Sequence, residues 1–181
     1  DNEEYFQRKQ TYRDADGTFY ADNDDRAIFS GRGVLETVKK LGWSPDIIHC
    51  HGWMTGLIPL LIKTSYKEDP MFHNSKVVYS LYNDSFDEPF NTNFGKKILM
   101  DGLTAADVKE LKDPNYVSLT KLAMQWSDAV VKSSPTIHDQ VETAFKKLTK
   151  PTLDYKSPEE YIEAYDTFYD EAVLEDSVLA D

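Results

Sequence analysis

Residues 43–62 read Trp-Ser-Pro-Asp-Ile-Ile-His-Cys-His-Gly-Trp-Met-Thr-Gly-Leu-Ile-Pro-Leu-Leu-Ile, and this stretch decides the fold. Residues 46–50 form a short apolar run without alternation, which predicts a strand buried on both faces, as in a parallel sheet. His51, Gly52 and Trp53 then turn the chain into a helix expected over about 54–67, with Pro59 as a kink or early interruption. Ligands of open α/β sheets bind just past the carboxyl ends of the strands, so these three residues are the first candidates for chemistry.

Further strands and helices follow in alternation. Residues 76–81 and 129–132 predict strands, and 151–155 predicts a short edge strand. Apolar residues at helical spacing predict helices over 24–41, 116–127, 135–148 and 158–174. The expected helix starts are Asn23 or Asp24, Ser134 with Pro135, and the run 157–160. This alternation predicts a Rossmann-like, doubly wound, mostly parallel α/β fold, with further strands expected before residue 1.

The segments between these elements are expected to be irregular. Residues 7–22 predict a loop with a weak hairpin around Asp16-Gly17, and residues 84–103 predict a loop. Thr104 and Asp107 have the spacing of a capping box before a short helix.

Composition narrows the class of protein. The 181 residues suit one domain with a substantial core, and 20 Lys and Arg against 32 Asp and Glu give a net charge of −12. That charge repels phosphate backbones and anionic membranes, so we expect no nucleic acid and no membrane partner. No apolar run reaches the roughly 20 residues needed to cross a bilayer, and no secretory leader is visible. A single cysteine, Cys50, expected to be buried, cannot form an intrachain disulfide, which favours a cytoplasmic location.

Several motifs together resemble the first domain of bacterial glycogen and plant starch synthases. They are Asn23-x-x-Arg26, then Pro-Asp-Ile-Ile-His-Cys-His-x-Trp-x-Thr, then the strand ending at Asn83, and then residues 128–137. The resemblance covers about residues 5–142. It implies the two-domain GT-B architecture and transfer of glucose from ADP-glucose to α-1,4-glucan. It also implies that His51, Trp53, Thr55, Tyr82 and Asn83 occupy substrate-binding positions.

The chain departs from the family pattern at two of the reacting-site positions. Gly52 stands where the family has an Asp near the reacting sugar, and Tyr82 stands where it has a His that contacts the transferred glucose. Glycine offers no group to steady a forming glucosyl cation. The family's Lys-x-Gly-Gly phosphate loop is not visible, so the catalytic residues are unknown.

The expected domain organisation is one partial synthase-like domain over residues 1–181. The residues after Lys150 are too few for the family's second nucleotide-sugar domain. The helix within 157–174 is expected to pack back on the first domain.

Each candidate site residue also has a structural interpretation. His49 and His51 share one side of a strand, but no third ligand accompanies them, so we expect no metal and no cofactor. His51 is either a sugar contact or a hydrogen-bonded structural residue. Trp53 is either a sugar platform or a packing residue, and Asn83 either caps its turn or holds a hydroxyl group.

Two further features carry alternatives. Phe86, Phe90 and Phe94, four residues apart, form either an aromatic glucan track or anchors for their loop. Arg26 is expected to pair with neighbouring acids rather than with a ligand.

Three functions remain open from the sequence. The first is a domain that is noncatalytic alone and binds α-glucan, or a partner in glycogen metabolism. The second is a glucosyltransferase that uses a nucleotide sugar and is completed by another chain or by preceding sequence. The third is a scaffold that acts only through a protein partner or as a homo-oligomer.

Overall fold

The computed structural model describes residues 3–99 and 102–174, and its centre is one parallel sheet. The strand order is β1-β2-β3-β4 and every neighbouring pair is parallel. The strands are β1 (Ile47–His51), β2 (Lys76–Leu81), β3 (Ala129–Lys132) and β4 (Thr152–Leu153). The predicted α/β fold and the three main strands are confirmed, and β4 is the short edge strand. β1 lies at the other edge of the described sheet, so its first three residues are only half-buried rather than buried on both faces.

The register places side chains in rows across the sheet. Cys50, Tyr79 and Val130 are aligned and point into the larger core, whereas Val78 and Ala129 are aligned and point to the opposite face. The loop before β3 is tied to the start of β2, because the Val77 amide donates to Asp128, 51 residues away. Both faces of β2 are therefore covered, as its unbroken apolar sequence predicts.

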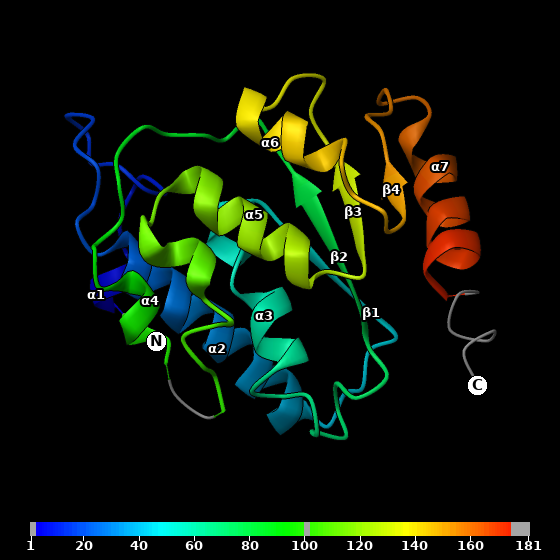
Figure 1. The fold of residues 1–181 in the computed structure, drawn as a ribbon, viewed down its shortest axis with the longest axis horizontal. Helices are drawn as coiled ribbons and strands as arrows, with labels where there is room; N and C mark the ends of the chain where they lie inside the picture. Colours follow the sequence, from blue (N-terminus) through cyan, green and yellow to red (C-terminus); the bar gives the residue numbers. More distant parts are fainter. Residues whose placement is uncertain (1–2, 100–101, 175–181) are drawn as a thin grey trace.

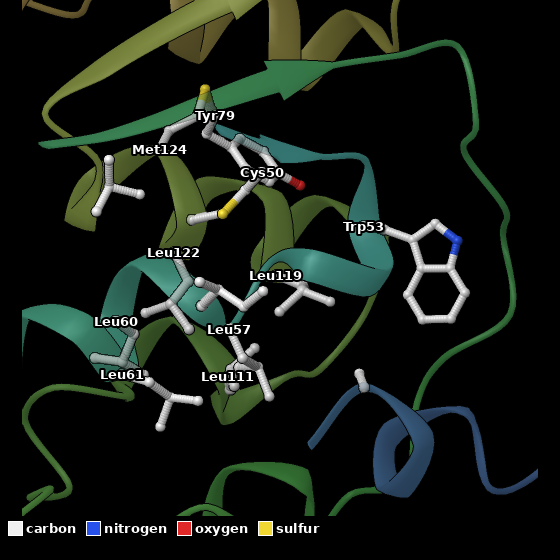
Figure 2. Close-up of a cluster of buried hydrophobic side chains, with 14 of the residues drawn as sticks. Cys50, Trp53, Leu57, Leu60, Leu61, Tyr79, Leu111, Leu119, Leu122 and Met124 are labelled. Carbon is white, nitrogen blue, oxygen red and sulfur yellow. The ribbon is translucent and has the colours of Figure 1, made fainter. Parts of the chain in front are cut away.

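Helices cover both faces of the sheet (Figure 1). The larger core lies under α2 (Asn23–Leu41), α3 (Ile58–Lys63), α5 (Tyr116–Trp126) and α6 (Asp139–Phe145). Figure 2 shows leucines of α3 and α5 gathered below Cys50 and Tyr79. The second face is covered by α7 (Tyr161–Thr167) and the π-helical segment η3 (Phe168–Leu174) that continues it.

Short elements connect these layers. They are α1 (Glu3–Phe6), η1 (Trp53–Thr55), α4 (Phe94–Lys97) and η2 (Lys109–Lys112). The helix predicted from residue 54 is thus a 3-10 turn followed by the shorter α3, with Pro59 in the first turn of α3. The hairpin within 7–22 is present as an antiparallel bridge between Arg13 and Phe19. Thr104 and Asp107 do bond to each other, but they close a turn rather than cap a helix.

All three predicted helix starts are wrong. The last helix begins at Tyr161, after a turn over residues 158–160, and Glu160 precedes it without a side-chain cap. The residue that precedes α2 is Asp22, which pairs with Arg8 rather than capping the helix, and Asn23 already lies inside it. α6 begins four residues after Pro135, with the His138 side chain as its cap. Ser134 does not cap α6; its hydroxyl instead accepts the Asn83 amide from the turn after β2.

The helix ends agree better with the sequence. Gly42 ends α2 in the left-handed conformation, with φ 64°, as predicted. Among the helices in the described ranges, none combines the length and the apolar character needed to cross a membrane.

Candidate functional site

The carboxyl ends of β1 and β2 bring two predicted site residues into contact. His51 ends β1 and pairs with Ser80, so its ring lies beside the first residue after β2. Its Nδ1 is 2.9 Å from the hydroxyl oxygen of Tyr82. The His51 side chain is exposed, and within the described residues no hydrogen bond engages its Nε2. One polar ring atom is therefore available to a ligand at this edge.

Gly52 has a backbone conformation that few other residues adopt. Its φ of 69° and ψ of 178° lie in a region that is essentially restricted to glycine. A Cβ built on Gly52 would lie 2.7 Å from Oδ2 of Asp84, closer than real Cβ contacts. The space beside Gly52 is therefore filled by a carboxylate from the next strand. The sequence places Asp84 just past the second strand, at the same sheet edge as Gly52, but it does not show that the two residues are in contact.

Asp84 is held by two other elements. Its Oδ2 accepts the Trp53 amide of η1 at 3.3 Å, and its Oδ1 accepts the Tyr116 hydroxyl of α5 at 2.8 Å. Burial raises the pKa of Asp84 above its ordinary value, while the Tyr116 bond opposes that shift. Residue 52 itself has no carboxylate, as its sequence shows, but Asp84 places one beside it.

The remaining predicted site residues have distinct environments. Trp53 is only 3% exposed and packs edge-on against Tyr12 and Phe86, so its indole has the packing role and offers no free face to a sugar ring. Thr55 donates its hydroxyl to the Gly52 carbonyl at 3.0 Å and so closes the turn. Asn83 is exposed; its backbone amide donates to Ser134, and among the described residues its side chain has no hydrogen-bond partner.

A polar network lies between the sheet and α7, and its tyrosines were not expected as site residues. His49 makes contacts of 2.5 Å to the Tyr169 hydroxyl and 2.7 Å to the Ser80 hydroxyl. Ser133 bonds both Ser80 and the Tyr165 hydroxyl at 2.9 Å. The sequence pattern places both tyrosines on an apolar stripe. Their buried polar tips need partners, and this is the signal that would have found them.

Burial dominates the acid–base behaviour of the two histidines. It lowers the pKa of His49 to about 4, with a further contribution from His51, whose ring stacks on it at 4.1 Å between centroids. Burial also lowers the pKa of His51. Neither ring is part of a metal site in the described chain, where no group of three or more His, Cys, Asp or Glu side chains is placed to hold an ion.

The other singled-out residues are structural. Phe86, Phe90 and Phe94 are buried and in ring contact, which is the anchoring role rather than an exposed glucan track. Arg26 is buried and donates to the carbonyls of Tyr5 and Thr11 and to the Asn23 side chain. The expected pairing of Arg26 with acids is therefore wrong, because this motif holds the N-terminal segment against α2.

The turns after the first three strands carry no positive side chain. Residues 52–55, 82–86 and 133–138 contain neither Lys nor Arg. Lys132, the last residue of β3, is paired with Glu142 at 2.7 Å. A diphosphate binds best to fixed cations, so these turns suit a neutral ligand better than an anionic one.

Comparison with known proteins places this geometry in a family. The sequence matches the family described as the starch synthase catalytic domain over residues 1–153. The chain belongs to this starch synthase family. A glycogen synthase of Photobacterium profundum is 33% identical over 143 residues, which cover 79% of this chain and 28% of that protein. A glycogen synthase of Clostridium perfringens is 34% identical over 150 residues, covering 80% and 29%.

A solved starch synthase shares the fold. The catalytic domain of starch synthase IV from Arabidopsis thaliana, bound to ADP and acarbose, superposes with a TM-score of 0.57 at 20% identity. The match covers 83% of this chain and 32% of that structure. The GT-B-type, Rossmann-like resemblance is confirmed. This starch synthase-family chain spans less than a third of the length of these relatives.

Proposed function

We propose that this domain binds α-glucan at the carboxyl edge of its sheet and does not transfer glucose by itself. One observation carries the proposal: the edge presents neutral hydrogen-bonding groups, while the turns after β1, β2 and β3 present no cation. The exposed groups are the Asn83 side-chain amide and the His51 ring, of which only Nδ1 is hydrogen-bonded, to Tyr82, within the described residues.

The chemistry of these groups matches a sugar polymer. Hydroxyl groups of a glucan both donate and accept hydrogen bonds, and a ring nitrogen and an amide can satisfy both roles. Transfer from a nucleotide sugar also needs stabilisation of a diphosphate leaving group, which requires positive charge. The turns after β1 and β2 carry hydrogen-bonding groups suited to glucan hydroxyls, but they carry no positive charge for a diphosphate.

Calorimetric titration tests the proposal. We expect maltoheptaose to bind the wild-type chain and ADP-glucose to give no heat of binding and no release of ADP. His51→Ala and Asn83→Ala should each weaken maltoheptaose binding several-fold. Release of ADP from ADP-glucose at rates well above buffer would overturn the proposal.

Matched controls lie at the opposite edge of the sheet. His73 and Asn74 are exposed residues in the turn before β2. His73→Ala and Asn74→Ala should leave maltoheptaose binding unchanged. Equal losses in the site and control variants would point to nonspecific association. If no glucan shifts the melting temperature at all, the scaffold interpretation replaces the binding one, because only a ligand that prefers the folded state raises stability.

A second candidate is a glucosyltransferase completed by sequence or by a chain outside these 181 residues. The position of Asp84 favours it, since a carboxylate beside residue 52 is the kind of group that can steady a forming glucosyl cation. Glucose transfer that appears only when a Rossmann-type partner is added would support this candidate over the first.

A further inference from the structure

The contact between Asp84 and Gly52 links two neighbouring turns. The Asp84 carboxylate reaches across from β2 to the turn after β1, where its Oδ2 occupies the place that a side chain on residue 52 would need. The two residues are therefore coupled: a side chain at position 52 would have to displace the Asp84 carboxylate from its present place.

The carboxylate is oriented as a ligand-binding group would be. Bonds from the Tyr116 hydroxyl and the Trp53 amide fix its two oxygens, and both donors come from well-buried residues. A carboxylate has about four lone-pair sites, so each oxygen keeps capacity for a further donor. Asp84 itself is half-buried rather than fully enclosed.

The neighbours of Asp84 are the exposed groups of the sheet edge. Asn83 directly precedes it in the chain. His51 ends β1 and Tyr82 follows β2, so this hydrogen-bonded pair joins the same two strand ends. Sugar hydroxyls are donors, and a fixed carboxylate oxygen is a strong acceptor for them.

We propose that Asp84 is the carboxylate that accepts hydrogen bonds from glucan hydroxyls at this edge, and that Gly52 makes room for it. This inference rests on the proposed binding of α-glucan, and it adds a residue to the site. The Asp84 carboxylate lies where a side chain on residue 52 would otherwise extend.

The test compares Asp84→Asn with Asp87→Asn. Asp87 is exposed in the same loop, so its substitution removes the same charge without touching Gly52. We expect Asp84→Asn to weaken maltoheptaose binding about tenfold, and Asp87→Asn to leave it unchanged. Tyr116→Phe removes a bond to Asp84 from a residue that is 2% exposed. Tyr116→Phe therefore measures how maltoheptaose binding changes when Asp84 keeps its carboxylate but loses one of the bonds that hold it.

The outcomes separate this inference from the function on which it rests. If the wild type binds maltoheptaose and Asp84→Asn binds it equally well, the inference fails while glucan binding stands. If the wild type does not bind, both fail. A loss in Asp84→Asn no larger than in Tyr116→Phe would assign Asp84 a purely structural role. Should Asp84→Asn not fold, the wild-type carboxyl carbon signal of Asp84 must shift on adding maltoheptaose, and an unchanged signal overturns the inference.

Discussion

At the carboxyl end of β1, the absence of a side chain at Gly52 and the position of the Asp84 carboxylate are coupled. Gly52 combines a glycine-only backbone with a 2.7 Å approach of Asp84 Oδ2 to its absent Cβ. Steric and backbone effects therefore act in the same direction at this position. Gly33, within α2, has no atom within 4 Å of a built Cβ and makes a matched comparison.

We expect Gly52→Ala to lower the free energy of unfolding by about 1–3 kcal/mol, because alanine must adopt a sparsely populated conformation and displace Asp84. Gly33→Ala should raise it by about 0.5–1 kcal/mol, because alanine favours a helix interior. Urea denaturation measures both. Similar effects of the two substitutions would contradict the described geometry of the Gly52 turn.

The low pKa of His49 makes stability depend on pH. Its value of about 4 lies below the ordinary 6.5, so between these two pH values the unfolded chain binds more protons than the folded one. The free energy of unfolding should therefore fall as pH is lowered through this window, by on the order of 2 kcal/mol from His49. His49→Gln should flatten the profile, while His73→Gln, at an exposed site, should not.

At the scale of elements, α7 and the η3 segment that continues it are attached to the sheet through tyrosine hydroxyls as well as apolar contacts. Tyr169 reaches His49 on β1, and Tyr165 reaches Ser133 after β3. Phe168 and Val173 fill the apolar part of the same interface.

Removing one of these hydroxyls should loosen α7. We expect Tyr169→Phe to cost about 1 kcal/mol or more, because it leaves Nδ1 of His49 without its partner while Nε2 keeps Ser80. Tyr161→Phe is the control, since Tyr161 is 47% exposed and its ring contact with Tyr165 is kept. Hydrogen exchange of the α7 amides should accelerate only in Tyr169→Phe. Equal exchange in both variants would show that the hydroxyl contributes nothing to docking.

The sequence predicts elements well where one physical signal dominates. Unbroken apolar runs locate β2 and β3, and Gly42 locates the end of α2. It fails where a side chain has a distant alternative partner. Ser134, Asn23 and Asp24 resemble helix caps, but their side chains bond the Asn83 amide, Arg26 and Lys97 instead. Asp84 was missed for the same reason, because its neighbours Gly52 and Tyr116 are close only after folding.

At the scale of the whole molecule, most stability resides in the larger core. Leu119 on α5 is fully buried there, whereas Leu41 at the end of α2 is 72% exposed. Leu119→Ala should lower the free energy of unfolding by about 2–5 kcal/mol, since it leaves a cavity. Leu41→Ala should change it by less than about 0.5 kcal/mol. Thermal denaturation followed by circular dichroism distinguishes them, and equal melting temperatures would contradict the placement of α5.

The sheet edges bear on the expectation of a protein partner or a homo-oligomer, which stays a prediction, as does the cytoplasmic location. Within the described residues β1 pairs on one side only, with β2. An unpaired strand edge is a surface that natural proteins usually cover or protect. Sedimentation analysis of the chain over a range of concentrations would show whether copies of it associate.

The all-parallel strand order also sets how the chain can acquire its structure. No two neighbouring strands are joined by a tight turn, and the link from Val77 to Asp128 spans 51 residues. Closing so long a segment costs conformational entropy before the strand pairing can offset it, and this slows folding. We therefore expect the β1–α3–β2 unit to assemble early and the arrival of β3 to limit the overall rate. During synthesis, the edge of β2 that pairs with β3 would therefore stay unpaired until the chain beyond residue 128 has left the ribosome.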